Sequence, residues 1–382
     1  MPATAIIDRA EFRPAMKLAK AIVPRRNGTP ILSHALLRAN GDSGMELLVT
    51  DLDVMATVRL NSATADAAFD TTLPARALAD LDAKAAKGGE YLSIEANGGE
   101  GNAALHFGTA AFTLQELPPA DFPMLEWSGP VKADFTIPAA NLATLLGKTA
   151  FAMSTESTRY YLNGVYLHAP QTPGEIGTLR AVGCDGHRLA VATVSLPAAQ
   201  GMPGVIIPAG TVNILRGLLK GKGVPPQVRV KVNTTKVIFE IGNVTILSKL
   251  IDGTFPEYGR VIPSFADKVI HFDPADMVAA ISAVSQISSE RGRAVKMEVA
   301  PGVMALSVTN PDQGTARQEI AIDYDGAPVT IGFNARYVLD ILATMDVGAA
   351  GLARLAIAGA RESALFGVPN SAEFFVLLPM RV

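Results

Sequence analysis

One pattern of hydrophobic and polar positions occurs six times along the 382-residue chain. In each copy a short segment alternates apolar and polar residues, as a half-buried strand does. Apolar residues spaced three and four apart follow, as in an amphipathic helix, after a proline or a small polar residue. The copies begin near Ala5, Asp70, Asp134, Val205, Val269 and Val329. The pattern predicts six strand–helix units, and their spacing of about 60 to 70 residues indicates an internal repeat.

The segments between the copies also have the alternation of strands. Residues 228–250, for example, alternate in runs separated by hairpin turns. A parallel doubly wound sheet needs one helix for each strand, whereas here several strands follow each helix. The sequence therefore predicts an α+β fold of three similar antiparallel domains with two helices each, over residues 1–130, 131–267 and 268–382. Chance recurrence is the alternative, because a strand followed by a helix is a common succession.

Composition and charge limit the classes of protein that fit. Apolar residues make up 49% of the chain and charged residues 18%, as in a folded rather than a disordered protein. A net charge of −3 excludes a uniformly basic surface for nucleic acid. Several predicted helices nevertheless lean basic, as in the segment with Arg216, Lys220 and Lys222. Such helices attract phosphates or are simply solvated, and the sequence leaves both readings open.

The N-terminal segment and the single cysteine indicate a compartment. Asp8, Arg9 and Glu11 stand where a signal peptide needs an apolar run. No long charge-free stretch lacks prolines and glycines, so no membrane span is expected. Cys184 alone forms no disulfide within the chain, which fits a reducing environment. We expect a cytoplasmic protein.

Candidate catalytic chemistry is limited to one cluster. The five histidines are scattered singly, and the Gly-Lys-Thr at 147–149 lacks the upstream glycine of a phosphate loop, so neither a metal nor a cofactor is expected. Within residues 184–188, Cys184, Asp185 and His187 could act as nucleophile, orienting acid and base of a cytosolic cysteine hydrolase or transferase. The Asp-Gly pair instead favours a hairpin turn between two strands. The turn is the preferred interpretation.

Ordered motifs along the whole chain carry a resemblance to a known family. They include CDGHRLAV at 184–191, RYYLNG at 159–164, KLIDGTFPEYGRVIP at 249–263 and LLPMRV at 377–382. Shorter matches are TPIL, TDLD, LPPADFP and GFNARYVLDIL. Together they resemble the β subunit of bacterial DNA polymerase III, the DNA sliding clamp. The resemblance implies a non-catalytic processivity factor: a homodimeric ring, lined by helices, that encircles duplex DNA and tethers the replicative polymerase, the clamp loader and other partners.

The resemblance also implies three sets of site residues. The peptide-binding pocket would comprise Leu162, Cys184, Gly186, His187, Arg188, Leu189, Pro256, Arg260, Val261, Val376, Leu378, Pro379, Met380 and Arg381. The DNA contacts would be Arg26, Arg76, Tyr160, Tyr161 and Arg216. The dimer interface would include Phe112, Leu114 and Ile287. For Leu378 and Met380 a place in a last core strand is the alternative.

Overall fold

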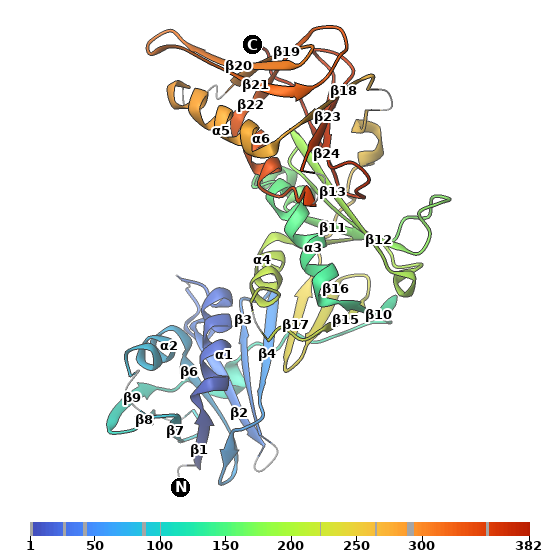
Figure 1. Cartoon of the computed structure of the whole chain (residues 1–382). Helices are drawn as coiled ribbons and strands as arrows, with labels where there is room; N and C mark the ends of the chain where they lie inside the picture. Colours follow the sequence, from blue (N-terminus) through green and yellow to red (C-terminus); the bar gives the residue numbers. More distant parts are fainter. Residues whose placement is uncertain are drawn as a thin grey trace. The chain divides into compact units, whose positions relative to one another are not determined.

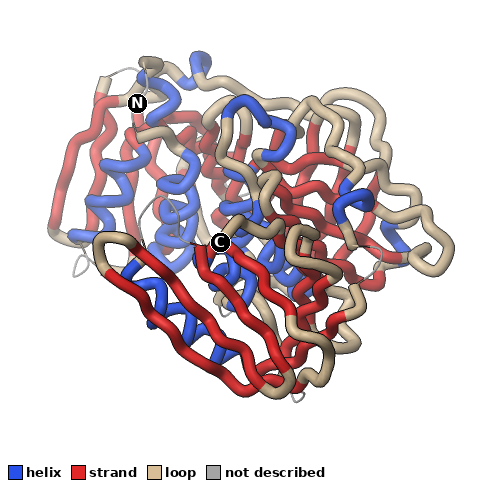
Figure 2. The backbone as a smooth tube through the Cα atoms, turned by 90° about the horizontal axis from the view of Figure 1, so that it is seen from above, coloured by secondary structure: helices blue, strands red, loops and turns tan. Residues whose placement is uncertain are grey.

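The structure is a computed structural model that describes residues 3–25, 28–40, 44–85, 89–99, 101–221, 223–263, 266–288, 294–348 and 351–382. The chain divides into two compact units (Figure 1). One unit comprises residues 1–140 and 213–250, and the other comprises residues 141–212 and 251–382. Most of the backbone is strand or loop, and helices are the smaller part (Figure 2).

The first unit holds two antiparallel sheets. The five-stranded sheet has the order β5 (Thr64–Ala65), β1 (Ala3–Asp8), β7 (Tyr91–Ala96), β8 (Asn102–Phe107), β9 (Ala110–Gln115). The eight-stranded sheet has the order β10 (Ala133–Pro138), β15 (Gln227–Val232), β16 (Lys236–Ile241), β17 (Val244–Lys249), β4 (Val54–Leu60), β3 (Met45–Thr50), β2 (His34–Asn40), β6 (Ala68–Pro74). The ladder between β17 and β4 therefore joins strands of the first and second predicted domains.

The second unit holds one antiparallel sheet of twelve strands. Its order is β14 (Val205–Pro208), β11 (Gly164–His168), β12 (Thr178–Cys184), β13 (Arg188–Ser195), β25 (Phe374–Leu377), β24 (Ala364–Gly367), β23 (Ala353–Ile357), β18 (Lys268–Phe272), β21 (Gly314–Asp323), β20 (Val303–Asn310), β19 (Ala294–Ala300), β22 (Val329–Asn334). The ladder between β13 and β25 joins strands of the second and third predicted domains. The exact domain limits stay a prediction.

The six predicted strand–helix units are confirmed. The helices are α1 (Arg9–Ile22), α2 (Ala75–Lys84), α3 (Ala139–Thr149), α4 (Ala209–Leu218), α5 (Pro274–Val284) and α6 (Ala335–Leu342). Three begin after a side chain that accepts a backbone N–H of the first turn, namely Asp8, Asp273 and Asn334. Such caps satisfy amide groups that have no partner inside the helix. In the other three a proline ends the strand: Pro74, Pro138 and Pro208.

The residue pairings between neighbouring strands repeat in the same register. Strands β6, β14 and β22 each end where a helix begins, and the last residue but one of each can be followed through its paired residues across the next three strands. The equivalent position on β4, β13 and β21 is then Ala56, Ala190 and Ala316. Ala56 lies opposite Ile246 of β17, and Ala190 lies opposite Phe375 of β25. An alanine thus faces a large apolar residue at both ladders that join predicted domains.

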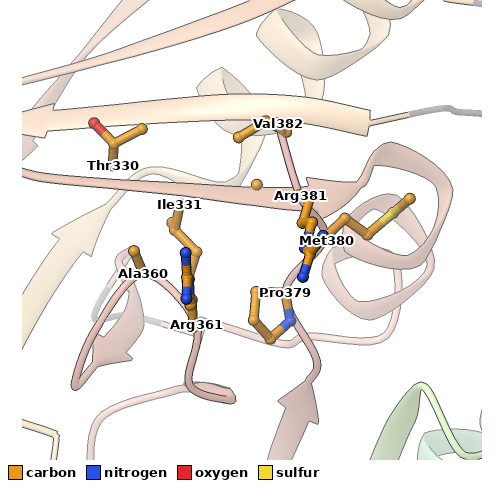
Figure 3. Close-up of a pocket in the computed structure, with 9 residues that line it drawn as sticks. Thr330, Ile331, Ala360, Arg361, Pro379, Met380, Arg381 and Val382 are labelled. Carbon is orange, nitrogen blue, oxygen red and sulfur yellow. The ribbon is translucent and has the colours of Figure 1, made fainter.

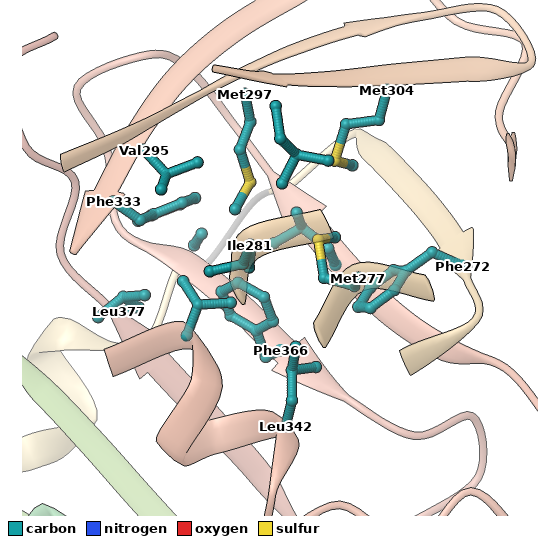
Figure 4. Packing of buried hydrophobic residues seen from close by; sticks show 14 of the residues in the cluster. Phe272, Met277, Ile281, Val295, Met297, Met304, Phe333, Leu342, Phe366 and Leu377 are labelled. Carbon is teal, nitrogen blue, oxygen red and sulfur yellow. The ribbon is translucent and has the colours of Figure 1, made fainter. Parts of the chain in front are cut away.

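Helices α5 and α6 cover the core of the second unit (Figure 4). Met277 and Ile281 of α5 lie among Phe272, Met297 and Phe366, all with relative exposure of 1% or less. Burying each such side chain contributes about 1.5 to 3 kcal/mol. The core therefore fixes β25, and with it the chain segment that follows Leu377.

Candidate peptide-binding and DNA-facing sites

The segment 184–188 forms the predicted hairpin turn between β12 and β13. One carboxylate oxygen of Asp185 accepts the backbone N–H groups of His187 and Arg188, each at 2.9 Å. Gly186 has a φ of +87°, in the left-handed region that favours glycine. A β-carbon there would also lie 2.1 Å from the Arg159 guanidinium. The positive φ is what favours glycine in this turn, since the Arg159 guanidinium ends a flexible side chain that can move.

A small apolar cavity of about 70 Å³ opens beside this turn. We call it the docking pocket, and its lining is Cys184, Gly186, His187, Arg188, Leu189, Val261, Val376 and Leu378. Leu189 and Val376 face each other across the β13–β25 ladder. The backbone N–H of Leu378 donates to the His187 carbonyl at 3.0 Å. Residues about 190 positions apart in the printed sequence therefore meet, as the resemblance implied.

The remaining implied pocket residues lie elsewhere. Leu162 is buried in the apolar cluster that also contains Leu189 and Val376. Pro256 is exposed, and so is Arg260, which forms an ion pair with Glu257. Pro379, Met380 and Arg381 line a separate hollow (Figure 3). In this structure, eight of the fourteen implied residues surround one cavity.

Arg188 is bound on every side by groups of its own unit. Its side chain is 10% exposed and pairs with Asp185 at 3.0 Å and with Asp340 of α6 at 2.6 Å. Its guanidinium donates to the Phe151 carbonyl and lies 4.4 Å from the centre of the Tyr337 ring. The His187 ring stacks on Tyr337 as well, at 6.1 Å. Arg188 therefore holds the turn against α6, a role that the motif at 332–342 did not reveal.

The geometry does not support a catalytic cysteine. Burial raises the pKa of the Cys184 thiol, although its sulfur also accepts the Gly186 N–H at 3.4 Å. A nucleophilic cysteine needs the opposite shift, because the thiolate is the reactive form. The His187 ring stacks on the Tyr337 ring. A hydrolase or transferase is therefore not supported.

A hydrogen-bonded aromatic cluster, which the sequence analysis missed, contains Tyr258, whose ring packs against the same apolar cluster as Leu189 and Val376. The Tyr258 hydroxyl lies 3.0 Å from Nε2 of His168 and accepts from Arg180 at 3.3 Å. Burial, reinforced by the charge of Arg180, lowers the pKa of His168 to about 4. Tyr258 begins the short 3₁₀ helix η7 (Tyr258–Val261). The cluster therefore fixes the segment that brings Val261 to the pocket.

The residues that the resemblance assigns to DNA contact differ in exposure and in their hydrogen-bond partners. Arg26 lies outside the described residues. Arg76 donates to the carbonyls of Lys20 and Val23 at the end of α1, at 3.2 and 2.7 Å. Arg216 is half-buried, and Tyr160 is 53% exposed and packs edge-on against Tyr161. Their contact with DNA stays a prediction.

The residues that the resemblance assigns to the dimer interface lie on an edge strand and at the end of a 3₁₀ helix. Phe112 and Leu114 are half-buried on β9, the last strand of the five-stranded sheet. The Phe112 ring packs edge-on against Phe107 at 5.9 Å. Ile287 ends the 3₁₀ helix η8 (Ser285–Ile287) and is half-buried. Their role at an interface stays a prediction.

Among the helices that the structure describes, none is long and apolar enough to cross a membrane. No group of three or more histidine, cysteine or acidic side chains within the described ranges could hold a metal ion.

Family models match almost the whole chain in three consecutive parts. The N-terminal, central and C-terminal domains of the DNA polymerase III beta subunit match residues 4–126, 136–257 and 259–381. The chain belongs to this family. The predicted fold of three antiparallel domains is confirmed. Members of this family are non-catalytic processivity factors of the polymerase.

Individual relatives agree along their full length. The beta sliding clamp of Caulobacter vibrioides is 39% identical over 98% of this chain and 99% of its own. That of Pseudomonas aeruginosa PAO1 is 32% identical with the same coverage. The solved clamp of Bartonella birtlesii, bound to griselimycin, has a TM-score of 0.93 and 36% identity with both chains fully covered. A Caulobacter crescentus clamp structure has a TM-score of 0.91 and 37% identity, also over both full chains.

Proposed function

We propose that this sliding clamp is a head-to-tail homodimer that encircles duplex DNA without reading its sequence. Through the docking pocket it tethers the replicative polymerase, the clamp loader and other DNA-processing proteins. Because the family serves bacterial DNA replication, we infer a cytoplasmic location. Tethering these proteins needs no catalytic group, because the clamp stays on DNA through closure of the ring around the duplex.

Two free strand edges support ring closure. β9 is bonded to β8 alone within the described residues. β21 is bonded along one side to β20, and on its other side only Ile322 and Asp323 meet β18. Its remaining edge, residues 314–321, has no ladder partner in the part of the chain that the structure describes. An unpaired edge of this kind is a template for pairing with another chain.

The repeat gives the register of the missing ladder, and this is the observation that carries the proposal. β9 and β17 both follow two-residue hairpin turns, so Phe112 holds the place of Ile246. Ile246 lies opposite Ala56, whose counterpart on β21 is Ala316. Phe112 should therefore lie opposite Ala316 of the partner subunit. A large side chain again meets an alanine, as at the two ladders within the chain.

This pairing closes a ring of two subunits. The contact is heterologous, because β9 of one copy meets β21 of the other, and such contacts form rings when the rotation closes. Two identical contacts suffice for a dimer. Diffuse attraction between basic helices and phosphates then holds DNA without fixing a register on its bases.

Disulfide trapping tests the register. In a Cys184→Ser background, Phe112→Cys with Ala316→Cys should give a covalent dimer on mild oxidation, since opposite residues are about 4.5 to 5.5 Å apart. The control pairs Phe112→Cys with Gln318→Cys, displaced by two residues or about 7 Å along the strand. Equal trapping in both pairs would refute the register.

The trapped dimer also tests encirclement. A ring that is first loaded on circular duplex and then cross-linked should stay bound in high salt and leave once the circle is cut, because it slides off free ends. Equal retention on circular and on cut duplex would contradict a ring. Leu378→Asp should abolish capture of a labelled polymerase peptide while leaving retention unchanged.

A further inference from the structure

A cavity with a volume of about 630 Å³ lies in the second unit. We call it the tyrosine hollow. Its lining comes from β11, β12, the segment that joins them, the segment before β14, and Tyr258 of η7. Of the described residues that line the docking pocket, none lines the tyrosine hollow. Small-molecule sites usually enclose about 300 to 1,000 Å³, so the tyrosine hollow has the size of such a site.

Three aromatic side chains line the tyrosine hollow, namely Tyr166, His168 and Tyr258. The Tyr166 ring stacks on the rings of both His168 and Phe255, with centres 4.7 and 4.8 Å apart. Within these pairs the ring planes are inclined by 22° and 5°. The Tyr258 ring lies 5.9 Å from that of His168. This lining suits a flat aromatic ligand, because planar rings stack or pack edge-on at such distances.

The hydrogen bonds of His168 assign the proton of its ring. A guanidinium can only donate, so the Tyr258 oxygen accepts a hydrogen of Arg180 at 3.3 Å. Tyr258 donates its own hydrogen to Nε2 of His168, at 3.0 Å. Because burial and the charge of Arg180 lower the pKa of His168 to about 4, the ring is neutral near pH 7. A neutral ring that accepts at Nε2 carries its hydrogen on Nδ1.

Two donors of the tyrosine hollow have no hydrogen-bond partner in the part of the chain that the structure describes. They are the Nδ1–H group of His168 and the hydroxyl of Tyr166. Burial raises the pKa of Tyr166, so this hydroxyl keeps its hydrogen. Only the bare backbone of Gly204 lies against it at that position, since a β-carbon there would collide with the hydroxyl. The tyrosine hollow therefore offers two donors to a ligand.

The charges of the lining add to this preference. Its described lining holds one cation, Arg180, and one acid, Glu175, which form an ion pair with each other. The Arg180 side chain is 13% exposed and that of Glu175 is 37% exposed. Solvent therefore screens the acid more than the cation. Unpartnered donors beside a buried cation favour a ligand that carries a negative acceptor group.

We propose that the tyrosine hollow binds a small planar aromatic carboxylate. The flat ring packs against the aromatic lining, and the carboxylate accepts from His168 and Tyr166. Met202 and Pro203 supply further apolar surface for the ring. The site lies outside the docking pocket and does not depend on the proposed function.

Ligand-observed NMR with 2-naphthoate as the probe tests the proposal. The probe should bind at least about fivefold more tightly than 2-naphthamide, which lacks the charge, and than decalin-2-carboxylate, which lacks the flat rings. Tyr166→Phe with His168→Phe keeps the stacked rings and removes both donors, so it should reduce the affinity for 2-naphthoate to that for the amide. Tyr91→Phe is the matched control, because Tyr91 is 56% exposed in the first unit, and it should change nothing.

Two further variants locate the probe. Thr172→Trp, at an exposed lining residue, should fill the tyrosine hollow and block binding, and it decides alone if the double variant does not fold. Leu378→Asp, in the docking pocket, should leave binding unchanged. The inference is overturned by absence of binding at millimolar probe, by equal affinities for 2-naphthoate and 2-naphthamide, or by binding that survives Thr172→Trp. Loss of binding in Leu378→Asp would place the probe in the docking pocket and overturn it too.

Discussion

Removing the Asp82 carboxylate should destabilise the first unit by about 3 kcal/mol. Arg9 is 2% exposed, and its Nε lies 2.6 Å from Oδ1 of Asp82. Arg9 also donates to the backbone carbonyls of Asp82 and Gly89, at 2.8 and 2.7 Å. Its guanidinium lies 5.2 Å from the centre of the Phe107 ring, against which Phe112 packs. The pair therefore supports the strand edge that we assign to ring closure.

The magnitude follows from what remains after Asp82→Ala. Leaving one partner of a buried ion pair uncompensated costs about 3 to 5 kcal/mol. The two carbonyl acceptors survive the substitution, which places the cost at the lower end. The second pair of Asp82, with Arg13 at 3.1 Å, adds less than about 1 kcal/mol because that arginine is 49% exposed.

Trp127 provides the assay, because it is the only tryptophan and belongs to the first unit. With a urea dependence of about 2 kcal/mol per molar, Asp82→Ala should lower the fluorescence midpoint by about 1.5 M. Replacing both charges, as Arg9→Met with Asp82→Leu, should restore most of the loss, since no unpaired charge remains. A shift below about 0.3 M for Asp82→Ala, or a double variant no more stable than the single one, would refute the reasoning.

Four further outcomes are expected. The folded pKa of His168, about 4, lies below the ordinary value of 6.5, so stability should fall as pH drops from 6.5 toward 4, and His168→Gln should flatten that slope in urea titrations. Phe112→Asp should give monomers by analytical ultracentrifugation, whereas Thr113→Asp, on the exposed face of β9, should not. Alkylated Cys184 should block peptide binding while DNA retention persists, and a loss of both would contradict its place in the pocket. Deleting residues 380–382 should weaken binding of a labelled docking peptide at least about tenfold in dimers that stay intact, and unchanged affinity would mean that this segment is only structural.

Much of the fold was predictable because local chemistry encodes it. Alternation, helical spacing and caps such as Asp8 mark each strand–helix unit. The Asp-Gly pair at 185–186 marks the hairpin, since its side chain and its φ act within a few residues. Leu189 and Val376, which the resemblance assigns to the pocket, line one cavity, whereas Met380, also assigned to it, lines another. Which cavity a terminal residue faces depends on the hydrogen bond from the Met380 N–H to the Gly332 carbonyl, which no local pattern encodes.

The alanines at the strand pairs that join domains could not be recognised from the sequence alone. Ala56, Ala190 and Ala316 occur in unlike surroundings in the sequence, and nothing local marks them as equivalent. Pairing across the sheets makes them equivalent, because a shift of one residue would turn every side chain to the other face of its strand. At two of these positions the facing residue is Ile246 or Phe375 in the same chain. At the third the described chain supplies no facing residue, and Phe112, on the equivalent free edge, is the matching large side chain. The same packing rule that joins domains within one chain is therefore the rule we expect to join two chains.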